Sequence, residues 1–136
     1  MRMMMTAVAL SLVLSAAASH ATAKPPLRDV AEIDNNMLWV ALAIEISDKC
    51  DEIDARTFKG LTFLNSLRNR AKALGYSNDE IKAYVDSDTE EARIRSIGEA
   101  YVKSKGLNPA QSADLCSLGH AEIAASSQIG VLLKAK

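Results

Sequence analysis

The amino-acid sequence predicts an all-α fold, a compact bundle of about four to five helices stapled by one disulfide. Apolar residues recur at helical spacing along most of the chain, and no segment shows the alternation of a half-buried strand. Helix start and stop signals separate these stretches. The two cysteines, Cys50 and Cys116, lie toward the two ends of the helical region.

The N-terminal residues have the order of a cleavable export signal. Arg2 precedes an apolar run over residues 7–18, and the small residues Ala21 and Ala23 form a signal-peptidase site. We therefore expect residues 1–23 to be removed and Lys24 to become the first residue. The alternative is an anchor helix that stays attached, but the run is shorter than the roughly 20 residues that cross a bilayer. The two prolines after Lys24 also end it abruptly.

Residues 24–136 are expected to form a single helical domain, because 113 of the 136 residues remain and suit one hydrophobic core. Cleavage of the signal removes one of the 16 Lys and Arg residues, Arg2, and none of the 17 Asp and Glu residues, so the domain becomes slightly more acidic. Basic and acidic residues are interspersed, so the chain has no basic stripe that would bind phosphates. Nucleic acid is not an expected partner, and no later segment is a candidate transmembrane helix.

The first helix of the domain is expected to lie in the middle of the fold. From Met37 to Ile46 every residue is apolar except Glu45, so apolar side chains surround the helix. Glu45 is a candidate functional carboxylate, since burial in such a run would raise its pKa. The alternative is that Glu45 occupies the one exposed strip or pairs with an arginine.

The second helix is expected to start at Asp54 as N-cap, with Ile53 and Phe58 as a hydrophobic staple, and to run to about Leu74. Gly75 provides the left-handed stop. One face of this helix carries the residues expected to face the core: Gly60, Phe63, Leu64, Leu67, Ala71 and Leu74.

The next helix opens with a capping box over residues 77–80, with Tyr76 and Ile81 as its staple. Its apolar face then changes direction, which predicts a kink or break near residues 86–88, where residues 88–91 form a second possible capping box. After Gly106, Asn108 and Pro109 are expected to start the last helix. Its stripe consists of Leu118, Ala121, Ala125, Ile129 and Leu132.

Groups that support catalysis or metal binding are scarce. His20 leaves with the signal, and His120 is then the one remaining imidazole, without a nearby nucleophile motif. A zinc site is not expected, because three or four ligands are needed. Residues 86–91 lack the turn glycine of a calcium loop, and no glycine-rich phosphate loop is present. We expect no metal, no cofactor and no enzymatic activity; Glu45 and His120 are the only candidate general acids or bases.

The two cysteines are expected to form a disulfide, because thiols in an exported chain meet an oxidising compartment. The alternative is a redox-active or copper-binding thiol pair. Cys50 and Cys116 lack the Cys-x-x-Cys spacing that commonly tunes such sites. The disulfide would join the end of the first helix to the start of the last.

Several segments resemble a family of small exported alphaproteobacterial proteins classed as a domain of unknown function. The resemblance covers the whole mature chain, both cysteines included, and rests on residues 24–30, 63–67, 74–77, 121–123 and 127–133. It implies a periplasmic location. It transfers no functional residue.

Two functional classes follow. The first is a non-catalytic periplasmic interaction or assembly module, whose partner would be another exported protein or a membrane complex. The second is a binder of a small molecule or lipid, in a cavity between helices. Four aromatic residues are candidates to line such a cavity, although ordinary core packing would also account for them: Trp39, Tyr76, Tyr84 and Tyr101.

Overall fold

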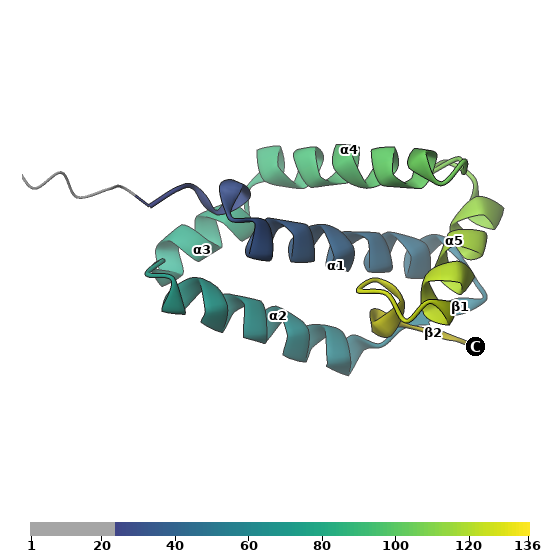
Figure 1. The fold of residues 1–136 in the computed structure, drawn as a ribbon, viewed down its shortest axis with the longest axis horizontal. Coiled ribbons are helices and arrows are strands. Elements are labelled where there is room, and N and C mark those ends of the chain that lie inside the picture. The colour runs from purple at the N-terminus through teal and green to yellow at the C-terminus, as the bar shows by residue number, and fades with distance from the viewer. Residues whose placement is uncertain (1–23) are drawn as a thin grey trace, which may run out of the picture.

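The computed structural model of the protein describes residues 24–136 and shows a helical bundle, as predicted (Figure 1). The predicted export signal, with Ala21 and Ala23, lies outside the described residues. The helices are α1 (Ala31–Lys49), α2 (Thr57–Ala73), α3 (Asn78–Val85), α4 (Asp88–Ser104) and α5 (Ser112–Ala124). Two short 3₁₀ helices, η1 (Leu27–Asp29) and η2 (Gly130–Leu132), and two strands, β1 (Ile53–Ala55) and β2 (Leu133–Ala135), complete the described fold.

Helix α1 lies in the middle of the bundle, between α4 on one side and α2 on the other (Figure 1). Helix α3 joins α2 to α4 at one end, and α5 lies with the small sheet at the other. The central position of α1 agrees with the prediction made from the apolar side chains on all sides of this helix. Within residues 24–136, no helix is both long and apolar enough to cross a membrane.

The main hydrophobic core joins α1 to α4, α5 and the C-terminal segment. Ile46, Ile53, Leu115, Ile129 and Leu133 are its most deeply buried large aliphatic side chains. Burying a side chain of this size contributes about 1.5 to 3 kcal/mol. A second buried cluster joins η1, α1, α2 and the loop between α2 and α3; its members are Leu27, Ile33, Leu67, Ala71 and Tyr76.

The start of the second helix was predicted wrongly. Asp54 lies in strand β1 and pairs with Lys134 of β2, and the two strands form a small antiparallel sheet. Helix α2 begins at Thr57, where the Arg56 N–H donates to the Leu132 carbonyl. Phe58 does not form the predicted hydrophobic staple with Ile53, because its side chain is 85% exposed. The sheet also corrects the expectation that the chain contains no strand.

The predicted capping box is confirmed at the start of α3. The Ser77 hydroxyl accepts from the Glu80 N–H, and the Glu80 carboxylate accepts from the Ser77 N–H. The break predicted near residues 86–88 is also confirmed, because α3 ends at Val85 and α4 begins at Asp88. The cap of α4 lies one residue earlier than predicted: Ser87 accepts from the Glu90 N–H.

The last helix differs from the prediction at both ends. Asn108 forms a turn instead of a helix start, because its side chain accepts from the Ala110 N–H and its N–H donates to Asp114. Helix α5 starts at Ser112 and ends at Ala124, and the chain reverses at Ser126, whose φ is +48°. Of the predicted core stripe, Leu118 is buried on α5, and Ile129 and Leu132 are buried from the segment after the helix. Ala121 and Ala125 were predicted wrongly, because both are exposed.

The predicted disulfide between Cys50 and Cys116 is present in the structure. Cys50 is the residue at which α1 ends, and Cys116 lies in the second turn of α5. Their Cα atoms are 5.2 Å apart, within the usual range for a disulfide. The bond therefore fixes the end of the central helix to the last helix.

Candidate functional site: an apolar groove between α1 and α4

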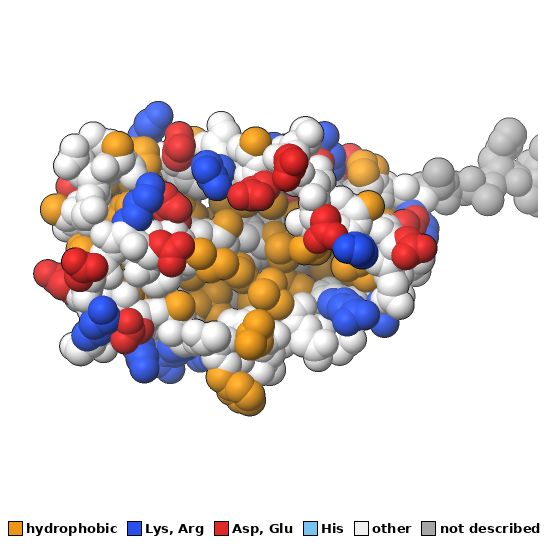
Figure 2. Space-filling view, turned by 180° about the vertical axis from the view of Figure 1, so that it is seen from behind, with side chains coloured by type: hydrophobic (Ala, Val, Ile, Leu, Met, Phe, Trp, Pro, Cys, Tyr) orange, Lys and Arg blue, Asp and Glu red, His pale blue; other side chains and the backbone are white. Residues whose placement is uncertain are grey.

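A groove of about 420 Å³ runs along α1 and α4 on the face shown in Figure 2. Apolar side chains gather along the middle of this face, and charged side chains surround them. Most of the groove is contributed by α1 and α4, with Tyr84 and Val85 at the end of α3 and Pro109 and Leu115 near the start of α5. The apolar residues contributed by α1 and α4 are Met37, Leu38, Val40, Ala41, Leu42, Ile44, Ile94, Gly98 and Val102.

The groove exists because α1 is apolar on all sides while its neighbours cover only part of its circumference. Ile44, which is 50% exposed, lies on the uncovered part. Val85 is also largely exposed at the groove. Exposed apolar side chains that gather in one hollow typically mark a binding surface, whereas scattered ones do not.

Gly98 sets the depth of the groove. A Cβ atom at this position would lie 3.3 Å from Cδ2 of Leu42, which is tighter than ordinary packing. The absence of a side chain therefore lets α4 approach α1 closely and leaves Leu42 and Leu38 as the floor. A larger residue would displace these leucines.

The rim of the groove is acidic. Five of its lining residues carry carboxylates, whereas Arg95 is its one cation; the carboxylates are those of Glu45, Asp48, Glu90, Glu91 and Glu99. Glu45 pairs with Lys49, and Glu91 pairs with Arg95 at 3.1 Å. Asp48 and Glu99 form no ion pair with any residue of 24–136. The rim thus carries negative charge that the described part of the chain does not neutralise.

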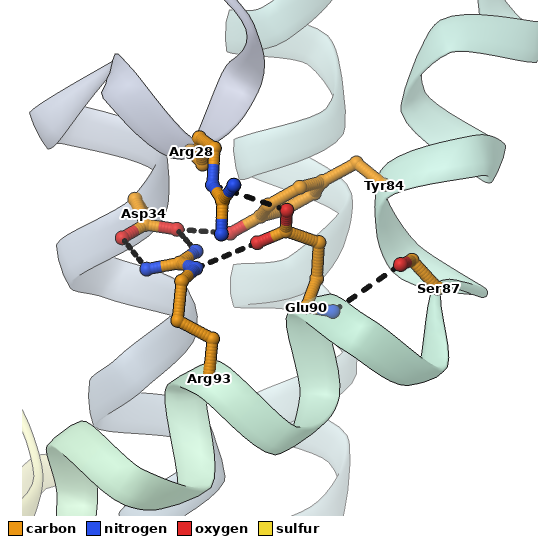
Figure 3. A network of polar contacts seen from close by, with 6 residues as sticks. All are labelled: Arg28, Asp34, Tyr84, Ser87, Glu90 and Arg93. Atoms are coloured by element: carbon orange, nitrogen blue, oxygen red, sulfur yellow. Dashed lines mark hydrogen bonds and ion pairs between the residues drawn. The ribbon is translucent and has the colours of Figure 1, made fainter.

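A polar cluster lies beside the groove and ties four elements together (Figure 3). Arg93 of α4 donates to both carboxylate oxygens of Asp34 in α1, at 3.0 and 2.5 Å, and to Glu90 at 2.7 Å. The Tyr84 hydroxyl of α3 donates to Asp34 at 2.6 Å, and Arg28 of η1 lies 3.2 Å from Glu90. Because Tyr84 and Glu90 line the groove, this cluster fixes the positions of two of its walls.

The ionisation of the cluster follows from these contacts. Burial alone would raise the pKa of Asp34, but the hydrogen bonds from Arg93 and Tyr84 and the positive charges of Arg93 and Arg28 outweigh it, so its pKa lies below the ordinary value. Burial and the bond to Asp34 raise the pKa of the Tyr84 hydroxyl. The hydrogen bond to Asp34 raises that of Arg93. Asp34 and Arg93 are therefore both charged at neutral pH.

Replacing Asp34 by Asn should lower the free energy of unfolding at neutral pH by about 2 kcal/mol or more, because Arg93 then loses the charge of its bidentate partner in a largely buried site. Since the folded pKa of Asp34 is depressed, its stabilisation is complete above the unfolded pKa and is lost as the pH falls through the folded value. Urea unfolding of both proteins over this range measures the difference. A difference in the free energy of unfolding that stayed constant down to strongly acidic pH would contradict the depressed pKa of Asp34.

The candidate acid–base residues do not form a common site. Glu45 lies on the groove rim, where its side chain is 42% exposed and pairs with Lys49. The alternative of an ion pair named an arginine as the partner, and the structure places a lysine there. His120 lies on α5, outside the groove lining, with Nε2 2.8 Å from a carboxylate oxygen of Glu52. Among the described residues, neither Glu45 nor His120 forms a hydrogen bond with a serine, threonine or cysteine that could act as a nucleophile.

One group of potential metal ligands occurs near the disulfide. The side-chain atoms of Cys50, Glu52 and Cys116 lie within 4.8 Å of one another. Both sulfurs are consumed in the disulfide, and metal ions bind cysteine as the thiolate. The group is therefore explained by the disulfide and an adjacent surface carboxylate.

A buried carboxylate that sequence reasoning missed is Glu122, which is 7% exposed. Its Oε1 accepts from the Tyr101 hydroxyl at 2.5 Å, and Trp39 packs edge-on against the Tyr101 ring. Burial and this bond raise the pKa of Tyr101 to about 12. Leu118 belongs to the predicted core stripe, and Glu122 follows it by four residues, which is the spacing that could have indicated the burial of Glu122.

Replacing Tyr101 by Phe should lower the free energy of unfolding by about 1 to 3 kcal/mol, because the Glu122 carboxylate loses its hydrogen-bond donor while buried. Chemical denaturation measures the loss. In a background that carries Glu122→Leu, the same substitution should cost markedly less. Equal costs in the two backgrounds would show that the hydroxyl contributes nothing through Glu122.

Comparison with known proteins identifies the family of this chain. No curated protein and no solved structure matches it. The family of unknown function DUF5333 matches residues 25–134, which include the groove, the polar cluster and both cysteines. This chain therefore belongs to the family of unknown function DUF5333.

Proposed function

We propose that this protein is a non-catalytic interaction module of the periplasm, and that its α1–α4 groove binds an amphipathic helix of another exported protein or of a membrane complex. The observation that carries the proposal is the combination of an apolar floor with an acidic rim. An amphipathic helix binds by laying its apolar face into such a groove. The complementary partner helix carries Lys or Arg beside its apolar face.

Unneutralised charge on the rim supports this choice of partner. Of the five carboxylates on the groove rim, Asp48 and Glu99 have no ion-pair partner among the described residues. Basic residues of a bound helix would pair with them at the periphery, where ion pairs set orientation and association rate more than affinity. The apolar lining of the groove, including Ile44, would supply most of the affinity.

The proposed compartment rests on two observations. A disulfide such as Cys50–Cys116 is consistent with an oxidising location outside the cytoplasm. Residues 1–23 have the composition of a cleavable export signal.

The exported protein should begin at Lys24. Small residues at positions 21 and 23 match the requirement of signal peptidase, and cleavage follows the second of them. Edman sequencing or intact-mass measurement of protein from the periplasmic fraction determines the terminus. Retention of Met1 would refute both the processing and the proposed compartment.

Site-specific photo-crosslinking in the native host tests the proposed function. A photoreactive residue at position 44, which lines the groove, should crosslink to a partner protein, and the crosslinked peptide should be a helix with an apolar face and flanking Lys or Arg. The same residue at Asn69, exposed on α2 outside the groove, is the matched control. Equal crosslinking from both positions, or a crosslinked segment without basic residues, would refute the proposal.

The second candidate is a small-molecule or lipid ligand, which the groove volume of about 420 Å³ favours. Ligand pockets typically span about 300 to 1,000 Å³. Of the four aromatic residues considered for such a cavity, Tyr84 lines the groove; Tyr101 bonds to Glu122, Trp39 packs on Tyr101, and Tyr76 donates to the Pro25 carbonyl. Native mass spectrometry of protein from its own periplasm distinguishes the two, because a bound small molecule would favour this candidate.

A further inference from the structure

Helix α2 presents an exposed apolar projection close to its first turn. Phe58 is 85% exposed and Leu61 is 61% exposed, and residues three apart share one side of a helix. We call these two residues the α2 knob. Lys59, which is exposed, directly follows Phe58 in the chain and places a positive charge beside the knob. Arg56, two residues before Phe58, is also exposed, and its Nε donates to the Leu133 carbonyl at 3.0 Å.

The α2 knob has the properties that the groove requires of its occupant. It is an apolar side of a helix flanked by basic residues, and the groove is an apolar hollow flanked by carboxylates. Within residues 24–136, Lys59 forms no ion pair, and neither do Asp48 and Glu99 on the groove rim. We propose that, in the absence of its partner, the groove is occupied by the α2 knob of a second copy of this chain. This inference rests on the proposed function of the groove.

The arrangement of the two surfaces favours a two-fold symmetric dimer. Figure 2 shows the apolar hollow in the middle of one face and apolar side chains projecting at its lower edge, where α2 lies. A two-fold axis that runs parallel to that face, between the groove and α2, brings the faces of two copies together and places each knob over the groove of the other copy. The same contact then forms twice, as in an isologous interface. A partner helix would have to displace the knob, so self-association and partner binding would compete.

Sedimentation of the mature disulfide-bonded protein over a wide concentration range tests the inference. The wild type should dimerise, and added salt should weaken the dimer because opposite charges face each other. Phe58→Ser with Leu61→Ser removes the knob, and Ile44→Glu or Val85→Glu places a charge in the groove; each should weaken dimerisation about tenfold or more. Folding should be retained, since all four residues are at least half exposed. Ile97→Ser, an exposed apolar position on α4 outside the groove lining, is the matched control.

Mixing the variants provides the decisive result. Copies without a knob retain grooves, and Ile44→Glu copies retain knobs. Each variant alone therefore lacks both contacts and associates only weakly, but a mixture restores one of the two contacts. The mixture should therefore associate more strongly than either variant and more weakly than the wild type. A wild type that stays monomeric, or a mixture that does not associate, overturns the inference. Neither result affects the proposed function, which fails separately if position 44 captures no partner helix in the native host.

Discussion

Removal of the Cys50–Cys116 disulfide should lower the melting temperature more than any other change outside the buried core. The bond joins residues 66 positions apart, and the loop-entropy estimate for a closure of that length is roughly 4 kcal/mol. For a domain of this size, such a loss corresponds to a fall on the order of 15 °C. Helical content should be largely retained at low temperature, since the backbone hydrogen bonds of the helices do not involve the two sulfur atoms.

The double variant Cys50→Ser, Cys116→Ser and the wild type in a thiol reductant should show similar melting temperatures by circular dichroism. Reductant should leave the double variant unchanged, which separates the effect of the bond from other effects of the reagent. Two reactive thiols per chain in protein purified from the periplasm without reductant would contradict the disulfide, as would an unchanged melting temperature on reduction.

The substitution Gly130→Ala should destabilise the fold by about 3 kcal/mol or more, because the new methyl group would overlap the backbone of α5. A Cβ atom at this position would lie 2.7 Å from the Ile123 amide nitrogen and closer still to the Glu122 carbonyl. These are backbone atoms, so no side-chain rotation relieves the overlap. The C-terminal segment would have to move away from α5, which would expose Ile129 and Leu132.

Gly60→Ala is the matched control, since a Cβ at Gly60 meets no atom within 4 Å and the residue lies inside α2. This substitution should stabilise the protein by about 0.5 to 1 kcal/mol. Urea denaturation of the two variants measures both effects. Equal free energies of unfolding for the two variants would contradict the close approach of residue 130 to α5.

The sequence predicted those parts of the fold that depend on neighbouring residues. Helical periodicity gave the central position of α1, and local cap chemistry gave the Ser77 cap of α3 and the break before α4. The small sheet was missed because β1 and β2 are three residues each and pair across about 80 positions. No local pattern encodes such a pairing, and the same pairing displaced the predicted N-cap at Asp54.

The candidate site was only partly predictable for the same reason. The sequence showed that α1 is apolar on all sides, but which side stays uncovered depends on how α2, α4 and α5 pack around it. The bond between Arg93 and Asp34 joins residues 59 apart, so neither was singled out in advance. Glu45 was singled out, and it lies on the groove rim as a half-exposed carboxylate paired with a lysine.

Binding of a designed helical peptide, followed by backbone amide chemical shifts, tests the central claim that the α1–α4 groove receives an apolar helix with basic flanks. A peptide with an apolar face and flanking lysines should shift the amides of groove residues such as Ala41, Ile44 and Gly98. The same peptide with glutamates in place of the lysines should bind markedly more weakly, because it meets an acidic rim. Shifts of equal size with both peptides, or shifts confined to residues outside the groove, would contradict the account.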